Sequence, residues 1–257
     1  MHRVVGAADG VDQELLNSVR REGAGQRLAG GEWKGRGECM GARAKALFLD
    51  RDGVINQEVG YLHAREQVRW VDGIFDLCRV ARERGYKLVV VTNQAGIARG
   101  YYTEAQFEEL MEWMRGEFEG RGMKLDAVYF CPFHPEHGVG KYKREHEDRK
   151  PSAGMLRRAA RDLRLDLCSS VMVGDRCSDV AAAQAAGLRQ VFLLQGTETE
   201  RCAGDYHAVR SLQEVQQWLA VVAAASADEL AVGTGAEESV AGQPAESPAH
   251  PGDAGRR

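Results

Sequence analysis

The side chains that could carry chemistry in this sequence stand at the ends of short apolar runs. One run, residues 46–49, is followed by Asp50 and Asp52, and another, residues 170–174, is followed by Asp175. Thr92 and Asn93 stand at the end of a third apolar run. Arg149 and Lys150 stand just before the start of an expected helix. Parallel strands present their carboxyl ends at one edge of a sheet, so these acids, hydroxyl and bases are predicted to meet there.

This combination of residues suits phosphoryl transfer. Carboxylates that gather in one place repel each other unless a hard cation lies between them, and Mg²⁺ prefers oxygen ligands. We expect Asp50 to attack phosphorus as the nucleophile and Asp52 to act as general acid and base, because it is placed to reach the leaving oxygen. Asp175 would complete the cation site. Lys150 and Thr92 would stabilise charge on the equatorial phosphoryl oxygens.

Each of these residues also has an ordinary structural explanation. An Asp after a strand is often a turn or helix cap, Thr92 alone is a common strand-end hydroxyl, and Lys150 alone is a solvated base near a helix start. Asp179 is most simply an N-cap or first-turn acid, and we expect it to support the site rather than to act in it. The joint pattern is far more specific than any single member and favours an enzyme.

The apolar runs themselves predict the elements that position the site. They read ALFL (46–49), KLVVVT (87–92), AVYF (127–130), SVMVG (170–174) and QVFLL (190–194). Because they are continuous rather than alternating, they fit strands that are buried on both faces. Between them, apolar residues recur at helical spacing over 74–81 and 107–114, with a capping box of Thr103 and Gln106 before the second stretch, and further helices are expected near 151 and 179. Strands that alternate with helices predict an α/β fold with a doubly wound parallel sheet.

The two ends of the chain differ in composition from its middle. Residues 1–44 are rich in Gly and charge, and residues 222–257 are rich in Ala, Gly, Glu and Pro. Such segments bury too little apolar surface to offset the entropy of ordering. We expect a single phosphatase domain over 45–221, flanked by disordered tails, and we expect residues 1–39 to be dispensable.

Charge and cysteine content narrow the choice of partners. The net charge of −4 and the isoelectric point near 6.0 argue against a nucleic-acid surface. No apolar run approaches the roughly 20 residues that a membrane span needs, and no secretory signal is visible. The six cysteines contain no CxxC pair. We therefore expect a cytoplasmic protein with reduced thiols, a small-molecule substrate and no membrane partner, and we expect a monomer.

Four motifs resemble those of the haloacid dehalogenase-like (HAD-like) phosphatases. They read FLDRDGVIN, VVVTNQAGIARG, RKPSAGML and VGDRCSDVAAAQAAG, and the resemblance covers roughly residues 45–200. Within that group the chain is most similar to the heptose 1,7-bisphosphate 7-phosphatases, which serve ADP-heptose and lipopolysaccharide core precursor biosynthesis, and next to the related histidinol-phosphatases. The resemblance implies no large cap domain and an aspartyl-phosphate intermediate.

The same resemblance implies roles for individual residues. Mg²⁺ would be held by the side chains of Asp50 and Asp175 and by the carbonyl of Asp52. The substrate-binding residues would be Glu58, Tyr61, Asn93 and Arg149. A histidinol-phosphatase is the alternative with the same chemistry. A phosphorelay receiver is the alternative of another class, although an acid such as Asp52, placed to drive hydrolysis, speaks against it.

One departure from the family concerns a structural metal. Many relatives hold a zinc ion with C-x-H and C-x-C pairs ahead of the RKP motif, whereas this chain has Cys131-Pro132-Phe133 and His146-Glu147-Asp148. Zinc sites need four thiolate or imidazole ligands, so a structural Zn²⁺ is not expected here. A rearranged site that uses Cys131 with His134, His137 or His146 stays open.

Overall fold

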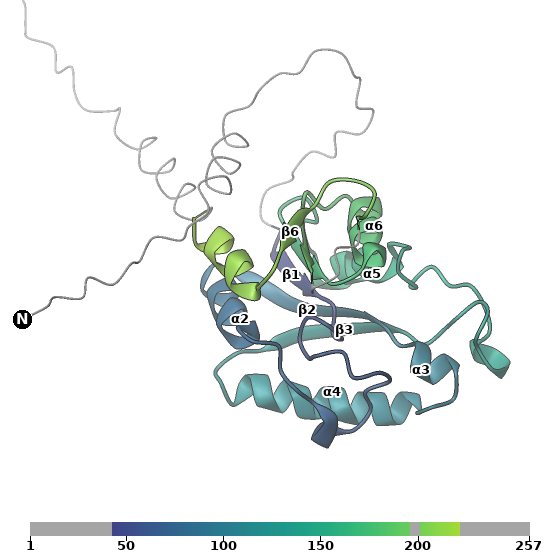
Figure 1. Ribbon diagram of the computed structural model, residues 1–257. Helices are drawn as coiled ribbons and strands as arrows, with labels where there is room; N and C mark the ends of the chain where they lie inside the picture. Colours follow the sequence, from purple (N-terminus) through teal and green to yellow (C-terminus); the bar gives the residue numbers. More distant parts are fainter. Residues whose placement is uncertain (1–42, 196–200, 222–257) are drawn as a thin grey trace, which may run out of the picture.

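A sheet of six parallel strands forms the centre of the computed structural model, which describes residues 43–195 and 201–221 (Figure 1). The strands are β1 (Lys45–Leu49), β2 (Tyr86–Asn93), β3 (Leu125–Cys131), β4 (Val171–Gly174), β5 (Gln190–Leu194) and β6 (His207–Val209). Their order in the sheet is β3-β2-β1-β4-β5-β6. The five apolar runs correspond to β1 to β5, which confirms the predicted doubly wound α/β fold. The short edge strand β6 has no counterpart in the sequence prediction.

Helices cover both faces of this sheet. The helices are α2 (Ile74–Glu83), α3 (Ala95–Ala98), α4 (Glu104–Glu119), α5 (Gly154–Leu163) and α6 (Cys177–Ala186), and residues 212–221 are also helical. Successive side chains of a strand point to opposite faces. Leu47 and Leu49 of β1 therefore belong to the core on the α2 and α4 side, whereas Ala46 and Phe48 belong to the core under α5 and α6. Figure 1 shows α4 and the α5–α6 pair on opposite sides of the sheet.

Local sequence signals fix several helix ends. Thr103 Oγ1 accepts a hydrogen bond from the backbone N–H of Gln106 at 3.2 Å, and Gln106 Oε1 accepts one from the Thr103 N–H at 2.9 Å, which confirms the capping box of α4. Gly187 ends α6 with a φ of 91°, a left-handed conformation that favours glycine. The helix expected near residue 151 begins at Gly154.

The two long segments that follow β1 and β3 contain little regular structure. Residues 50–73, between β1 and α2, contain one 3₁₀ turn (Arg65–Gln67), and residues 132–153, between β3 and α5, contain another (Gly140–Tyr142). Within the described part of the chain, neither segment forms a separate cap domain, as predicted. The predicted tails, 1–44 and 222–257, lie outside the described residues except for residues 43 and 44.

One expectation about the cysteines is wrong. Cys177 and Cys202 form a disulfide that links the first residue of α6 to the segment between β5 and β6. The two residues are 25 positions apart in the sequence and belong to no recognisable motif, so only the packing of that segment against α6 brings them together. Cys78, Cys131 and Cys168 are free thiols.

Candidate active site

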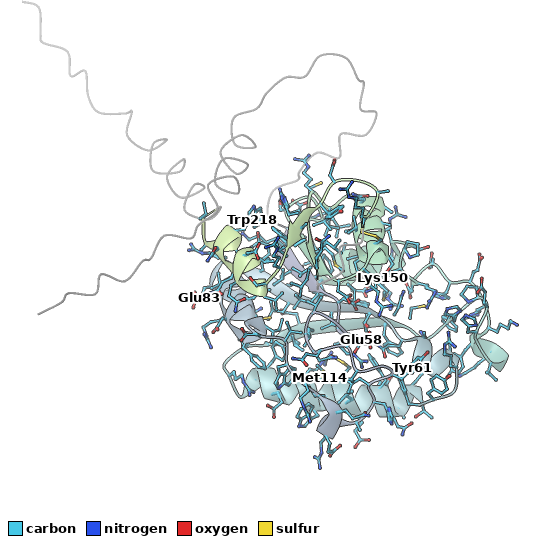
Figure 2. The ribbon with its side chains drawn as sticks, in the orientation of Figure 1. Glu58, Tyr61, Glu83, Met114, Lys150 and Trp218 are labelled. Carbon is cyan, nitrogen blue, oxygen red and sulfur yellow. A yellow bond between two sulfur atoms is a disulfide. The ribbon has the colours of Figure 1, made fainter. Side chains whose placement is uncertain are left out.

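A cavity of about 590 Å³ opens where the carboxyl ends of the central strands meet. Its lining includes eight of the predicted site residues, namely Asp50, Asp52, Glu58, Tyr61, Thr92, Asn93, Arg149 and Lys150. The ninth, Asp175, places a carboxylate oxygen within 4.8 Å of oxygens from Asp50 and Asp179. Figure 2 shows Lys150, Glu58 and Tyr61 among the side chains of this region. The structure thus brings the nine predicted catalytic, metal-binding and substrate-binding residues together.

Lys150 links two buried carboxylates at the base of the site. Its Nζ lies 2.8 Å from Asp50 Oδ2 and 2.5 Å from Asp179 Oδ1, and it also donates to the carbonyl of Val91 at 3.0 Å. Burial by itself would lower the pKa of Lys150, but the carboxylates of Asp179 and Asp50 outweigh burial and raise it. Lys150 is therefore a fixed positive charge beside the predicted nucleophile.

The acids of the site form a compact cluster. Ligand oxygens of Asp50, Asp175 and Asp179 all lie within 4.8 Å of one another, and Asp175 Oδ1 is buried with no hydrogen-bond partner. Burial, opposed by Lys150, raises the pKa of Asp50 to about 6, and burial with the charges of Asp50 and Asp179 raises that of Asp175 to about 7. Crowded carboxylates with an unsatisfied buried oxygen fit a hard divalent cation such as Mg²⁺.

Gly53 makes room for this cluster. Its φ of 84° is left-handed, and a Cβ on it would lie 2.1 Å from Asp175 Oδ2. The turn after β1 therefore approaches the loop after β4 closely only because residue 53 has no side chain.

Asp52 occupies a different electrostatic environment from the clustered acids. Arg51, Asn56 and Gln94 all donate hydrogen bonds to its carboxylate. Burial alone would raise the pKa of Asp52, but the charge and the hydrogen bonds of Arg51, with help from Asn56 and Gln94, outweigh burial and lower it. The two acids of the DRDG motif thus differ: Asp50 lies among other acids and Asp52 lies among donors.

The residues at the end of β2 organise the loop that carries Lys150. The Asn93 side chain donates to the carbonyl of Lys150 at 2.9 Å and accepts from its N–H at 3.0 Å. Both polar atoms of the Asn93 amide are therefore engaged with the backbone, and its predicted contact with substrate stays a prediction. Thr92 is buried, and its Oγ1 accepts from Gln94 Nε2 at 2.8 Å.

The rim of the cavity is rich in cationic and aromatic groups. Arg99, Arg149 and Arg176 all line it. Arg149 is half-buried and donates to the carbonyl of Phe133 at 3.0 Å. Glu58 accepts from Arg176 Nη2 at 2.9 Å. Tyr61 is 43% exposed, and the centre of its ring lies 4.5 Å from the centre of the Tyr101 ring. A polar ligand with a second anionic group fits this rim.

Four contributing residues were missed or undervalued by the sequence reasoning. Asp179 is a member of the acid cluster rather than only a first-turn acid, although its Oδ2 does accept the N–H of Arg176 at 3.1 Å. Arg51 and Gln94 hold Asp52, and Arg176 reaches the rim from the loop after β4. The spacing from Asp175 to Asp179 was visible in the sequence, but no pattern reveals where a buried arginine points.

The fold and the acid cluster define a HAD-like hydrolase. The HAD-hydrolase-like family model matches residues 148–215. The chain is 49% identical over 165 residues to a D-glycero-alpha-D-manno-heptose-1,7-bisphosphate 7-phosphatase of Burkholderia mallei. The aligned region spans 64% of this chain and 87% of that protein. It is 46% identical over 156 residues to a D-glycero-beta-D-manno-heptose-1,7-bisphosphate 7-phosphatase of Escherichia coli. That aligned region spans 61% of this chain and 82% of the relative. The chain therefore belongs to the family of heptose-1,7-bisphosphate 7-phosphatases.

A solved structure supports the same assignment. The crystal structure of D,D-heptose 1,7-bisphosphate phosphatase from B. bronchiseptica, complexed with magnesium and phosphate, superposes with a TM-score of 0.57 at 28% identity. The match covers 69% of this chain and 98% of that one.

None of the helices within 43–195 and 201–221 combines the length and apolar character that crossing a membrane requires.

Proposed function

We propose that this chain hydrolyses the C7 phosphate of D-glycero-D-manno-heptose 1,7-bisphosphate through an aspartyl-phosphate on Asp50, as a step in ADP-heptose and lipopolysaccharide core precursor biosynthesis. The observation that carries the proposal is the position of Asp50, whose carboxylate lines the cavity between Lys150 and the Asp175 carboxylate. The alternative function as a phosphorelay receiver is not supported, because the relatives that this chain matches are phosphatases.

In the first half of the reaction, an Asp50 oxygen forms a bond to the C7 phosphorus and the bond from phosphorus to the sugar oxygen breaks. Asp52 gives its proton to that departing oxygen, so the sugar leaves as an alcohol. Lys150 and the Thr92 hydroxyl stabilise the charge on the equatorial oxygens of the transferring group. This half-reaction leaves a phosphorylated Asp50 and an ionised Asp52.

In the second half, the Asp52 carboxylate takes a proton from a water molecule, which attacks phosphorus as the bond to Asp50 breaks. Inorganic phosphate leaves, Asp50 returns as a carboxylate, and Asp52 is protonated again. The lowered pKa of Asp52 without substrate suits this basic role. For the acid role, Asp52 takes up a proton when the phosphate dianion enters beside it, because a neighbouring negative charge favours the protonated carboxyl.

Mg²⁺ would be held by the carboxylates of Asp50 and Asp175 and by the backbone carbonyl of Asp52. The carboxylate of Asp179 lies close to this site. When bound, it supplies a Lewis acid that neutralises charge on the phosphoryl group. The unpartnered buried oxygen of Asp175 and the raised pKa values of Asp50 and Asp175 support this assignment. The relative from B. bronchiseptica was crystallised with magnesium and phosphate.

The cationic rim supports a bisphosphate over histidinol phosphate. Arg99 and Arg149 suit bidentate contact with the remote C1 phosphate, and binding there would orient the C7 phosphate. The amine and imidazole of histidinol phosphate would meet like charge at the same place. Glu58 and Tyr61 are available to hydrogen-bond sugar hydroxyls.

The test is a side-by-side assay of phosphate release from heptose 1,7-bisphosphate, histidinol phosphate and fructose 1,6-bisphosphate, with phosphorus NMR to locate the phosphate that remains. We expect the highest kcat/KM on the heptose bisphosphate and a product that retains its C1 phosphate. A higher kcat/KM on histidinol phosphate, or release of the C1 phosphate, would contradict the proposal. The cytoplasmic location and the monomeric state stay predictions.

We further propose that the loop between β3 and α5 holds no structural zinc. The residues at the family's ligand positions do not fit it: Phe133 offers no donor and its ring stacks on His146 at 4.6 Å, while Asp148 is ion-paired with Arg158 at 2.7 Å. Arg144 covers the same Phe133 ring at 4.0 Å, so packing and ion pairs support the loop instead. Elemental analysis of protein purified without added metal tests this, and stoichiometric zinc would contradict it.

A further inference from the structure

Arg51, between the two acids of the DRDG motif, has a fully buried side chain that is turned toward Asp52. Its Nε lies 3.1 Å from Asp52 Oδ1 and its Nη2 lies 2.8 Å from Asp52 Oδ2. The Arg51 side chain has 0% of its surface exposed, against 21% for Asp52, which lines the cavity. A guanidinium that grips both oxygens of one carboxylate fixes the rotation of that carboxylate as well as its position.

The rest of the protein holds the guanidinium itself in place. Arg51 Nη2 also donates to the carbonyl of Leu62 at 3.2 Å, in the loop that carries Glu58 and Tyr61. On another side, the guanidinium carbon lies 5.3 Å from the centre of the Phe107 ring of α4. Arg51 is therefore anchored by two elements that are distant from each other in the sequence.

Two amides complete the surroundings of the Asp52 carboxylate. Asn56 Nδ2 donates to Oδ1 at 3.0 Å, and Gln94 Nε2 lies 3.3 Å from Oδ2. Gln94 is oriented in turn, because its Nε2 also donates to Thr92 Oγ1 and its Oε1 accepts the hydroxyl of Tyr102. The longest of these contacts to Asp52 is the one from Gln94, on the side of the phosphoryl-binding Thr92.

We propose that Arg51 is a positioning residue: its guanidinium fork holds the Asp52 carboxylate in the orientation from which Asp52 exchanges a proton with the leaving oxygen and with the attacking water. The inference rests on the proposed acid and base role of Asp52. A single loose contact would leave the carboxylate free to rotate, whereas the fork, anchored at Leu62 and Phe107, removes that freedom before substrate arrives.

A comparison of leaving groups separates positioning from a merely structural role. A sugar alkoxide needs a proton as it leaves, whereas p-nitrophenolate does not, so misplacing the acid slows only the first kind of ester in the phosphorylation step. For Arg51→Met, which keeps an apolar stem but loses the fork, we expect kcat/KM to fall about 100-fold on the heptose bisphosphate and about threefold or less on p-nitrophenyl phosphate.

The second step gives an independent readout. With Asp52 misplaced, hydrolysis of the phosphoenzyme is slow for every substrate, so Arg51→Met should release a burst of about one p-nitrophenolate per active site before turnover. Arg51→Lys retains the charge without the fork, and we expect it to recover only part of the loss. Equal losses of kcat/KM on both esters, without a burst, would overturn the inference.

Two controls keep the result interpretable. Phe118→Leu disturbs the packing of α4 at its other end, where the Phe118 ring lies against Trp70 and Phe75, away from Arg51 and the donors to Asp52, and it should show no selective loss on the heptose bisphosphate. If Arg51→Met does not fold, Asn56→Leu removes the donor at 3.0 Å from Asp52 Oδ1 and should give a smaller loss with the same selectivity. An Asn56→Leu variant with equal losses on both esters would overturn the inference.

Asp52→Asn distinguishes failure of the inference from failure of the proposed function. If Asp52→Asn loses kcat/KM selectively on the heptose bisphosphate and Arg51→Met does not, the positioning role is wrong while the mechanism stands. If Asp52→Asn itself loses both activities equally, the acid role of Asp52 fails, and the inference about Arg51 falls with it.

Discussion

Lys150 Nζ lies 2.8 Å from Asp50 Oδ2, and both side chains are buried. The Lys150 ammonium therefore compensates the negative charge of Asp50 before substrate binds, in addition to its proposed contact with the phosphoryl group. Removal of its charge leaves acids that face each other in a poorly solvated site, which is costly to the folded state.

We accordingly expect Lys150→Met to lose both activity and stability. kcat/KM should fall about 1,000-fold, because the transferring phosphoryl group loses a fixed positive charge. Without added metal at neutral pH, the free energy of unfolding should fall by about 3 kcal/mol, because a buried charge pair is broken. Denaturant unfolding measures the second effect, and Lys143→Met, at an exposed lysine of the preceding loop, is the matched control. Unchanged stability of Lys150→Met would contradict the ion-pair argument.

Magnesium should stabilise the fold in a pH-dependent way. The pKa values of Asp50, about 6, and Asp175, about 7, are raised above the ordinary carboxyl value, so the native state binds these protons more tightly than the unfolded state does. In protein stripped of metal, the stability that these acids contribute is complete below about pH 4 and is lost as the pH rises through about 6 to 7. A bound dication replaces the protons, so Mg²⁺ should raise the thermal midpoint more at about pH 7.5 than at about pH 5.

Asp175→Asn is the control for that experiment. The substitution removes a ligand and a charge while keeping the shape of the side chain, and most of the gain from Mg²⁺ should disappear. An equal gain from Mg²⁺ at both pH values in the parent protein would contradict the assignment of these acids as the cation site. EDTA should stop catalysis, and added Mg²⁺ should restore it.

The disulfide gives a third prediction. Because Cys177 and Cys202 close a loop of 25 residues, Cys202→Ser should lower the free energy of unfolding of the oxidised protein by about 3 kcal/mol. Dithiothreitol should bring the parent protein down to the same value and leave Cys202→Ser unchanged. Cys168→Ser, at a free thiol, serves as the control. Parent protein that keeps its full stability in dithiothreitol would show that the bond does not contribute.

Deletion of residues 1–39 should leave kcat/KM and the thermal midpoint nearly unchanged, because every residue of the candidate site lies at position 50 or beyond. The measurement is a comparison of the shortened and full-length chains under the same conditions. A large loss of either quantity would mean that the removed segment packs on the phosphatase domain.

The sequence was sufficient for those parts of the site that sit at the ends of strands. Asp50, Thr92 and Asp175 each follow or end an apolar run, and a parallel sheet brings such positions together whatever the rest of the fold does. Lys150 was found because it immediately precedes a proline and a helix. The same reasoning located β1 to β5, whose continuous apolar runs have the short length that favours buried strands over helices.

Contacts that depend on side-chain direction could not be predicted in this way. Asn93 is adjacent to Thr92 in the sequence, yet its amide binds the backbone of Lys150. Arg51 lies between two acids, and only the packing against Leu62 and Phe107 decides which of them it holds. The disulfide was missed because tertiary packing, rather than local spacing, brings its two cysteines together.

The most direct test of the central claim is detection of the covalent intermediate. Asp52→Asn should still be phosphorylated but should hydrolyse the phosphoenzyme slowly, so a reaction with an activated aryl phosphate and Mg²⁺, quenched in acid, should trap it. Peptide mass spectrometry is predicted to find one added phosphoryl group on Asp50, and to find none in Asp50→Asn, which should also retain less than about a tenth of the parent activity. A phosphoryl group on any other residue, or substantial turnover by Asp50→Asn, would contradict the account.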